Sequence, residues 1–211
     1  MKTNGQTSVP TTENLILEAA RQVFLDKGLE GSRMQEIADR AGINKALLHY
    51  YFRNKQKLFE HVFESVIASF FPQVLHLIGS NKSVPEKIRQ FVSIYLDVIY
   101  ENPFIPRFII HEMNRDPAHL TTTMERIAGK DIRKQLKKLD EDLAEASQRG
   151  IIRPVNAEHL VINMLSLCIF PVVAEPIIAG ILFHKNEAEY KQFLLTRKEL
   201  VAEFIINGLK C

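Results

Sequence analysis

The stretch RMQEIADRAGINKALLHYYFRNKQKLF, residues 33–59, decides the fold of this chain. Its small and apolar residues recur where two short crossed helices must touch, and Ala38 is small enough to let the second helix approach. Gly42 lies where the chain must reverse, and glycine adopts a left-handed turn without steric cost. Asn44 then caps the second helix. This spacing predicts a helix-turn-helix, whose second helix is the element that enters a DNA major groove.

The residues on either side of this motif are typical of helix starts. Ser32 and Gln35 have the spacing of a capping box for the first short helix. Asn54 is expected to cap a third helix that begins at Lys55. A lysine beside the exposed amides of a helix N-terminus predicts a phosphate contact. Basic residues outnumber acidic ones by seven to three over residues 27–57, whereas the whole chain carries a net charge of only +2, so the basic excess lies where DNA contacts are needed.

The composition is that of an ordinary globular protein, with 211 residues, 46% hydrophobic and 25% charged. Cys168 and Cys211 give neither a disulfide framework nor zinc spacing, which favours a reducing, cytoplasmic location. Residues 1–10 lack the apolar segment of a signal peptide and are expected to form a flexible N-terminal arm.

Helical periodicity runs through the chain, and it predicts about nine helices and no strand. The first runs from Thr11 or Thr12 to near Gly28, the next two form the helix-turn-helix, and the others are expected at about 55–79, 85–101, 106–114, 116–150, 156–183 and 187–207. The predicted domains are a helix-turn-helix domain over residues 11–54 and a larger helical domain over residues 55–211.

The segment 160–183 is long and apolar enough to span a bilayer, with Glu175 as its only charged residue. Pro171 and Pro176 interrupt it, Glu175 lies near its middle, and basic clusters do not flank it. We therefore expect no membrane contact, and we expect burial by the chain's own core and by a second copy of the chain.

Residues 16–59 resemble the DNA-binding domain of the TetR family of one-component regulators. The positions that carry the resemblance are Ile16, Ala19, Ala20, Val23, Phe24, Gly28, Ile37, Ala38, Ala41, Gly42, Ile43, Lys45, Leu48, Phe52, Lys55, Leu58 and Phe59. The remaining helices and the total length look like the effector-binding and dimerisation domain of that family, an analogy at the level of the fold. The expected fold class is therefore all-α, with an N-terminal three-helix DNA-binding domain followed by a helical effector-binding and dimerisation domain.

The resemblance implies a repressor that binds a palindromic double-stranded DNA operator as a homodimer and leaves it when a small molecule binds. The helix that begins at Lys55 would couple that molecule to the spacing of the two recognition helices. The resemblance places the dimer interface on the last two long helices, where we expect contacts from Leu160, Leu165, Ile169, Ile177, Ile181, Phe204 and Ile205.

The same resemblance places the DNA contacts residue by residue. They are expected at Ser32, Arg33, Lys45, Ala46, Leu47, His49, Tyr50, Tyr51 and Lys55. Arg33 replaces a usual threonine, Leu47 replaces a small polar residue that often reads bases, and His49 stands where tyrosine is usual. These departures affect which bases are read.

A partly apolar effector is expected in a cavity of the second domain, since small-molecule sites are apolar with a few polar anchors. The candidate lining residues are Phe71, Tyr95, Phe104, Phe108, His111, Met164 and Cys168. The alternative interpretation of these side chains is that they belong to the hydrophobic core.

Motifs of catalysis are missing from the sequence, which contains no nucleophile elbow, phosphate loop or HExxH. We therefore expect no enzyme activity, no metal site and no cofactor. Two alternatives stay open, namely a DNA-binding or architectural protein of the same fold without an effector, and a helical enzyme or lipid-binding protein that carries a helix-turn-helix unit.

Overall fold

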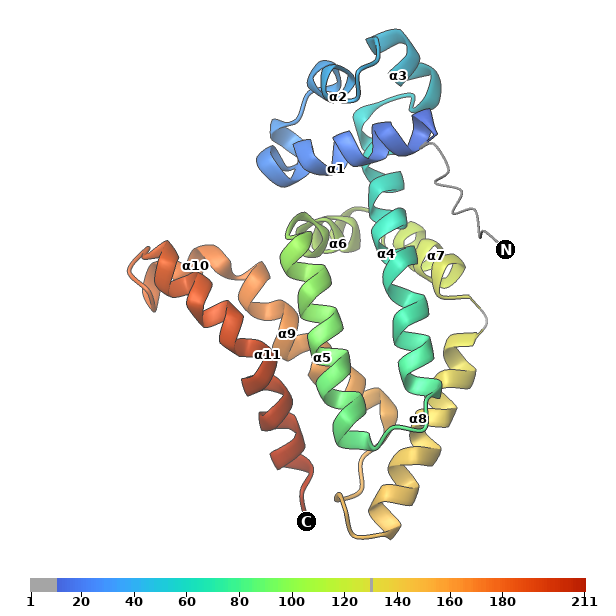
Figure 1. Cartoon of the computed structure of the whole chain (residues 1–211), viewed down its shortest axis with the longest axis vertical. Coiled ribbons are helices and arrows are strands. Elements are labelled where there is room, and N and C mark those ends of the chain that lie inside the picture. Colours follow the sequence, from blue (N-terminus) through green and yellow to red (C-terminus); the bar gives the residue numbers. More distant parts are fainter. Residues whose placement is uncertain (1–10, 130) are drawn as a thin grey trace, which may run out of the picture. The chain divides into compact units, whose positions relative to one another are not determined.

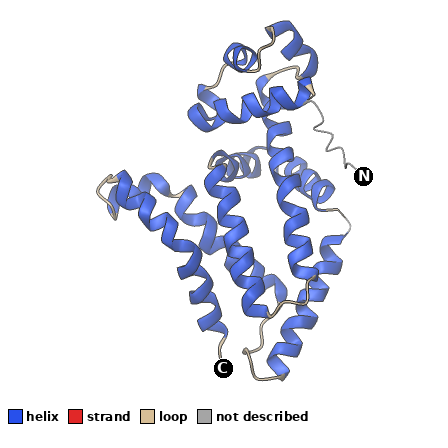
Figure 2. Ribbon diagram, in the orientation of Figure 1, coloured by secondary structure: helices blue, strands red, loops and turns tan. Residues whose placement is uncertain are grey.

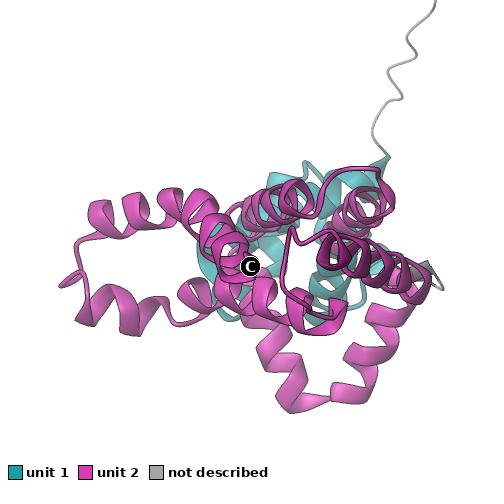
Figure 3. Ribbon diagram, turned by 90° about the horizontal axis from the view of Figure 1, so that it is seen from below, with its two compact units in different colours: residues 1–65 teal, residues 66–211 magenta. Residues whose placement is uncertain are grey.

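The structure, a computed structural model, describes residues 11–129 and 131–211, and this part of the chain consists of eleven helices and no strand (Figures 1 and 2). The all-helical prediction is confirmed. The expected N-terminal arm, residues 1–10, lies outside the described residues. The chain divides into two compact units, residues 1–65 and residues 66–211 (Figure 3).

The first unit is built from three helices and the beginning of a fourth. These are α1 (Thr12–Gly31), α2 (Met34–Arg40), α3 (Lys45–Tyr51) and the first part of α4 (Lys55–Gly79). Ile16, Ile37 and Leu48 come from three different helices and are completely buried. The ring of Phe59 in α4 meets that of Phe24 in α1 edge-on, with 4.7 Å between ring centroids. One small core therefore fixes the mutual positions of these four helical segments.

The second unit contains the rest of α4 and seven further helices. They are α5 (Val84–Glu101), α6 (Phe104–Arg115), α7 (Pro117–Ala128), α8 (Asp131–Gln148), α9 (Ala157–Val173), α10 (Glu175–Ile181) and α11 (Glu187–Leu209). Helix α5 packs against α8, α9 and α11. Its inward residues Val92 and Leu96 are fully buried in the main hydrophobic cluster. This central position follows from the amphipathic pattern of α5, which places apolar residues every three to four positions.

The described residues form eleven helices where about nine are predicted, because two expected helices are each broken. The segment 116–150 is interrupted at Gly129, whose φ of +69° ends α7. The segment 156–183 is interrupted at Ala174, and α9 and α10 are bent by 69° relative to one another. Pro176 explains the second break, since its nitrogen has no hydrogen to donate and its ring clashes with the carbonyl four residues earlier.

Most of the predicted helix starts are confirmed. The side chains of Asn44, Asn54 and Asn156 each accept a backbone N–H from the first turn of the following helix. The capping box predicted for Ser32 and Gln35 does not form. The Ser32 hydroxyl instead donates to the carbonyl of Gly28, while Gln35 donates to Asp39. Helix α2 therefore begins without a side-chain cap.

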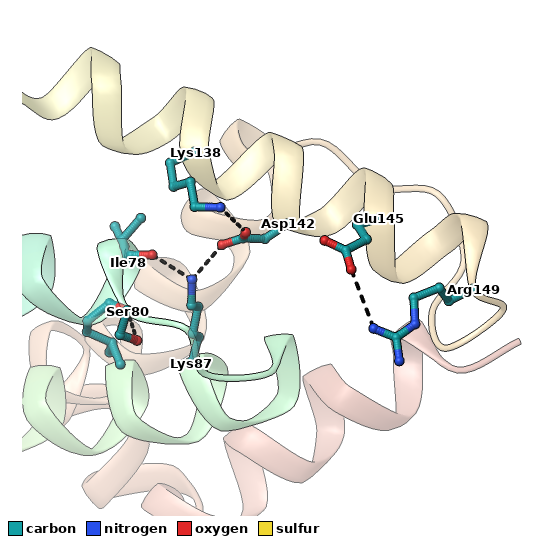
Figure 4. Close-up of polar contacts among 8 residues, drawn as sticks. Ile78, Ser80, Lys87, Lys138, Asp142, Glu145 and Arg149 are labelled. Carbon is teal, nitrogen blue, oxygen red and sulfur yellow. Dashed lines mark hydrogen bonds and ion pairs between the residues drawn. The ribbon is translucent and has the colours of Figure 1, made fainter.

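A buried lysine links α8 to α5 and to the end of α4 (Figure 4). Lys87 is 4% exposed, and its ammonium donates to the Ile78 carbonyl and to the Asp142 carboxylate, both at 2.5 Å. Lys138 donates to the other oxygen of Asp142 at 2.7 Å. Burial by itself raises the pKa of Asp142, but the hydrogen bonds from Lys138 and Lys87 outweigh it and hold the pKa below its usual value.

Two parts of the chain meet the length and composition of a membrane span. Helix α4 does so alone, and α9 with α10 would do so together if the 69° bend were absent. The core helix of a soluble protein passes the same test.

Candidate nucleic-acid interface

The turn between α2 and α3 is fixed by its own backbone. Gly42 has a φ of +68°, its N–H donates to the Asp39 carbonyl at 3.2 Å, and the N–H of Ile43 donates to the Ala38 carbonyl at 3.0 Å. These two bonds form a Schellman motif, which ends a helix at a left-handed residue. Asn44 then accepts the Leu47 N–H at 2.8 Å and starts α3. The chain thus ends one helix and begins the next within four residues.

Helix α3 has one buried side and one exposed side. Leu48 is completely buried against the core of the first unit, together with Ile37 and Ala38 of α2. Six of the nine predicted DNA contacts lie on α3 and are exposed, namely Lys45, Ala46, Leu47, His49, Tyr50 and Tyr51. An anchored helix whose other face is open to solvent has the form required for entry into a DNA groove.

Tyr50 is the most exposed of the large hydrophobic side chains of this helix, with 82% of its surface accessible. Its ring meets that of Tyr51 edge-on at a centroid distance of 5.6 Å. Tyr51 is 41% exposed and also lies against Phe52, which is buried. Tyr51 is therefore held by its neighbours, while Tyr50 projects with its hydroxyl available as donor and acceptor.

His49 is oriented by the chain that follows α3. Its Nδ1 lies 3.2 Å from the carbonyl oxygen of Arg53, and because a carbonyl only accepts, Nδ1 carries the proton. In the neutral ring Nε2 is then an acceptor, a role that the sequence pattern does not indicate.

Lys55 has a structural partner as well as the predicted phosphate role. Its ammonium donates to the carbonyl oxygens of Glu30 at 3.2 Å and Ser32 at 3.1 Å, which ties the start of α4 to the end of α1. Asn54 accepts the Lys57 N–H at 2.9 Å and caps the same helix. The Lys55 side chain is only partly buried, so the phosphate contact stays a prediction.

The two residues that precede α2 differ in accessibility. Ser32 is 3% exposed and its hydroxyl is occupied by Gly28, so a contact to DNA from this side chain would require it to turn outward. Arg33 is exposed and occupies the N-cap position of α2. Of this pair, Arg33 is the residue whose side chain is accessible.

Ion pairs reduce the basic excess that the sequence shows. Lys27 pairs with Glu36 at 2.8 Å, Arg40 with Asp26 at 3.2 Å and Lys57 with Glu60 at 2.7 Å. Four cations of this region have no carboxylate partner among the residues that the structure describes. They are Arg33, Lys45 and Arg53, together with Lys55, whose ammonium donates to two backbone carbonyls. Arg53, which is not among the nine predicted DNA contacts, therefore joins Arg33 and Lys45 as an available cation.

The seven predicted effector-binding residues do not share one cavity. Phe104, Phe108, Met164 and Cys168 are buried. Phe71 and Tyr95 pack partly buried against the main core, and the side chain of His111 is 58% exposed. Burial raises the pKa of the Cys168 thiol to about 12 and that of the Tyr95 hydroxyl well above its usual value, so both are neutral at physiological pH. Their role in binding an effector stays a prediction.

The larger cavity of the second unit has a volume of about 820 Å³ and lies among α5, α6, α9, α10 and α11. The seven predicted residues are not among its lining residues, whereas Tyr100, Arg107, Lys185, Tyr190 and Lys191 are. Met164 lines a second cavity of only about 20 Å³. The large cavity depends on the bend between α9 and α10, and Pro171 and Pro176 are the only signal of it in the sequence.

Comparison with known proteins agrees with this geometry. Residues 16–62 match the model of the bacterial regulatory proteins of the tetR family. The chain is 24% identical over 183 residues to YttP of Bacillus subtilis, a probable HTH-type transcriptional regulator, covering 85% of this chain and 86% of YttP. It is 26% identical over 163 residues to the HTH-type transcriptional regulator RutR of Escherichia coli K12, covering 76% and 74% of the two chains.

Similarity to a solved structure extends over both units. The crystal structure of HlyIIR, a hemolysin II transcriptional regulator, aligns with a TM-score of 0.57 and 26% identity, covering 95% of this chain and 97% of that one. The match of the family model falls on α1 to α4, the helices that present the exposed face of α3.

Proposed function

This chain belongs to the TetR family of transcriptional regulators, and we propose that it is a repressor that binds a palindromic operator as a homodimer and leaves it on binding a small molecule. The observation that carries the proposal is the anchored helix α3, with Leu48 buried and Tyr50 82% exposed. Such an arrangement presents side chains to a groove without any change in the unit that holds them.

The exposed face of α3 and the exposed residues just before α2 and just after α3 supply both kinds of contact that DNA recognition needs. Lys45, Arg33 and Arg53 are cations available for phosphates, which give affinity. Tyr50 and His49 offer hydrogen-bonding groups, and the Ala46 methyl suits a thymine methyl, so these three are proposed to read bases. Leu47 is 36% exposed and adds an apolar contact only.

The homodimer is supported by apolar side chains that the second unit leaves exposed. Ile177 and Ile181 on α10 are 64% and 68% exposed, and Phe204 on α11 is 70% exposed. Leu160 and Ile205, two other residues expected at the interface, are instead buried in the core of their own chain. Large exposed apolar side chains gathered on consecutive helices mark interaction surfaces. A palindromic operator requires two copies of α3 about 34–36 Å apart.

Release by a small molecule is supported by the 820 Å³ cavity, which lies within the range of about 300–1,000 Å³ typical of ligand sites. Helix α4 is continuous from Lys55 to Gly79, so it belongs to both units. A ligand acts only to the extent that it binds one arrangement of the recognition helices better than the other.

The experiment is selection of duplex DNA from a random library by the full-length chain, followed by binding measurements on the selected site. Tyr50→Ala is expected to lose sequence preference, and Lys45→Gln to weaken binding on all sequences and lower the salt slope by about one. The matched control is Lys82→Gln, an exposed lysine of the second unit, which should bind as the wild type does. Selection of no sequence, or equal binding by all three variants, would refute the proposal.

The dimer has its own test by sedimentation. Ile177→Glu should yield monomers that keep their helical content. An unpaired charge in a desolvated interface weakens the association of the two copies by about 2 kcal/mol or more. The control is Met113→Glu on α6, a residue that is 57% exposed but lies on a helix outside α9–α11. A stable dimer in the Ile177 variant would place the interface elsewhere.

A further inference from the structure

We propose that the cavity among α5, α6, α9, α10 and α11 binds a small molecule with an apolar body and a single anionic group, and that this molecule is the effector. The binding part of the inference concerns the second unit alone. The role of the molecule as effector rests on the function proposed above, because an effector acts by releasing the protein from DNA.

The cavity forms where the chain turns back on itself after α9. Helix α10, the residues that follow it and the first half of α11 make one wall, and the end of α5 with the start of α6 makes the facing wall (helices labelled in Figure 1). Apolar and small residues predominate on both walls: Ile99, Pro103, Val172, Pro176, Ala179, Gly180, Leu194 and Leu195. A ligand that fills this space must therefore present mainly apolar surface.

Two tyrosines of the cavity wall contribute no charge. The Tyr100 hydroxyl donates to the Leu194 carbonyl at 2.9 Å, and the Tyr190 hydroxyl donates to the Pro171 carbonyl at 2.6 Å. Burial raises the pKa of Tyr100 to about 12 and also raises that of Tyr190. Both hydroxyls therefore remain protonated, and each donates its proton to a carbonyl of the protein.

The charged groups of the lining are three cations and two carboxylates. Arg107 and Glu175 pair with each other at 2.8 Å, joining α6 to α10. The remaining charges of the lining are two positive ones, Lys185 and Lys191, and one negative one, Glu187. Neither lysine has an ion-pair partner among the residues that the structure describes. The unpaired charge facing the cavity is thus positive, so an anionic group is attracted while a cation of the same shape is repelled.

Occupation of this cavity would act on the surface proposed for the dimer. Pro176, Ala179 and Gly180 of α10 line the cavity, while Ile177 and Ile181 of the same helix are exposed. Helix α10 is short and meets α9 at a 69° bend, so its orientation depends on what fills the space beneath it. The ligand would therefore bias dimer geometry, which sets the spacing of the recognition helices.

The first experiment is isothermal titration of the full-length chain with three probes of equal chain length: decanoate, decanol and decyltrimethylammonium. We expect decanoate to bind most tightly and the cation least. The double variant Lys185→Gln/Lys191→Gln should weaken decanoate about fivefold and leave decanol unaffected, since two partly solvated charge contacts are removed. Lys82→Gln, just before the opposite end of α5, is the charge control and should bind decanoate like the wild type.

The second variant, Ala179→Phe, places a ring inside the cavity and should abolish binding of decanoate and decanol alike. Decanoate that binds this variant unchanged, or a cation that binds as well as the anion, would overturn the site or the ligand class respectively. The lysine variants lie at exposed positions and fold independently of this outcome, so they test the charge preference even if the filled variant is unstable.

The third measurement separates this inference from the proposed function. DNA obtained by selection is titrated with wild-type protein in the absence and presence of decanoate. Decanoate that binds in the cavity without weakening the DNA complex would overturn its role as effector. Protein that binds selected DNA but none of the three probes would overturn the ligand inference and leave the proposed DNA binding intact. Protein that binds decanoate but selects no DNA would overturn the proposed function and leave the ligand site intact.

Discussion

The two units differ in how far apart in sequence their stabilising contacts lie. In the first unit, Asn44 accepts the backbone N–H of Leu47, three residues later, and the hydrogen bond from Lys55 to the Glu30 carbonyl spans 25 positions. In the second unit, Lys87 bonds Asp142 across 55 positions, Tyr100 bonds the Leu194 carbonyl across 94, and Arg89 bonds Glu203 across 114. Local contacts leave a pattern in a short window of sequence, and distant contacts leave none.

The units also differ in where their exposed large apolar side chains lie. In the first, these are Leu15 on α1 and Leu47, Tyr50 and Tyr51 on α3, while Ile16, Ile37 and Leu48 have no exposed surface. In the second, helices α9–α11 and the residue after α10 leave large apolar side chains exposed: Ile162, Phe170, Ile177, Ile181, Leu182, Leu195, Leu200 and Phe204. In the first unit most of the exposed apolar side chains lie on the helix proposed to bind DNA, and in the second they lie on the helices proposed to bind a second copy of the chain. Four substitutions, from the largest expected effect to the smallest, compare the contacts that stabilise the two units.

The largest effect is expected from Leu48→Ala in the first unit. Deleting a fully buried leucine side chain costs about 2–5 kcal/mol, and this small core has few other contacts to compensate. The matched control is Leu47→Ala on the same helix, 36% exposed, which should cost less than about 0.5 kcal/mol. Denaturant unfolding gives the size of the loss, and hydrogen exchange should confine it to residues 11–65. Equal losses for the two leucines would mean that the inner and outer faces of α3 are wrongly assigned.

Asp142→Asn in the second unit is expected to cost about 2 kcal/mol at pH 7, because Lys87 is left buried without a counter-charge. The folded pKa of Asp142 is lowered, so its contribution is present above the unfolded value near 4 and is lost as pH falls through the folded value. Unfolding free energies of wild type and variant should therefore converge below about pH 4.

Lys87→Met provides the matched comparison for this pair. It removes the buried charge, while Asp142 keeps its ion pair with Lys138 at 2.7 Å and is partly exposed, so neither charge is left buried and unpaired and the loss should be smaller than that of Asp142→Asn. A loss at pH 7 as large as that of Asp142→Asn would contradict the assigned role of the ion pair. So would a difference in unfolding free energy between the wild type and the Asp142→Asn variant that grows towards low pH.

These contacts explain which parts can be predicted from the sequence. Gly42, Asn44 and Asn54 end or begin helices within three residues of their own positions. The sequence therefore predicts the helix-turn-helix and the start of α4 at the correct residues. Gly129 is equally visible, but charged helical periodicity continues on both sides of it, and the pattern therefore predicts one helix where the chain forms two.

Other features depend on contacts that no sequence window contains. Ser32 has the spacing of a capping box, yet α1 is kinked at Gly28, whose φ is +67°, and the Gly28 carbonyl accepts the Ser32 hydroxyl. The large cavity joins Tyr100 and Arg107 to Lys185 and Lys191, which are more than 75 positions away. Aromatic residues at helical spacing are also typical of a core, and this is where Phe104 and Phe108 lie.

Gly42→Ala should have a smaller effect, of about 1–2 kcal/mol, on the first unit. A Cβ at this position meets no atom within 4 Å, so the cost comes only from a φ of +68° that other residues avoid. The control is Gly208→Ala in the last turn of α11, where a Cβ also meets no atom within 4 Å. There the backbone is helical, and the change should stabilise by about 0.5–1 kcal/mol. Opposite signs in thermal unfolding support the assignment, and a loss at both sites contradicts it.

The smallest effect is expected from Arg89→Ala, which removes the ion pair with Glu203 that joins α5 to α11 at 2.8 Å. This contact spans more of the sequence than the Lys87–Asp142 pair, yet its two side chains are 50% and 41% exposed. Water screens such a pair, so we expect a loss of about 0.5 kcal/mol or less that disappears in about 1 M salt. A loss equal to that of Asp142→Asn would show that sequence separation, through the closure of a long loop, determines the strength of these links. The expected small, salt-sensitive loss would show that burial determines the strength of these links. Separation along the chain would then make a contact hard to predict from the sequence without making it strong.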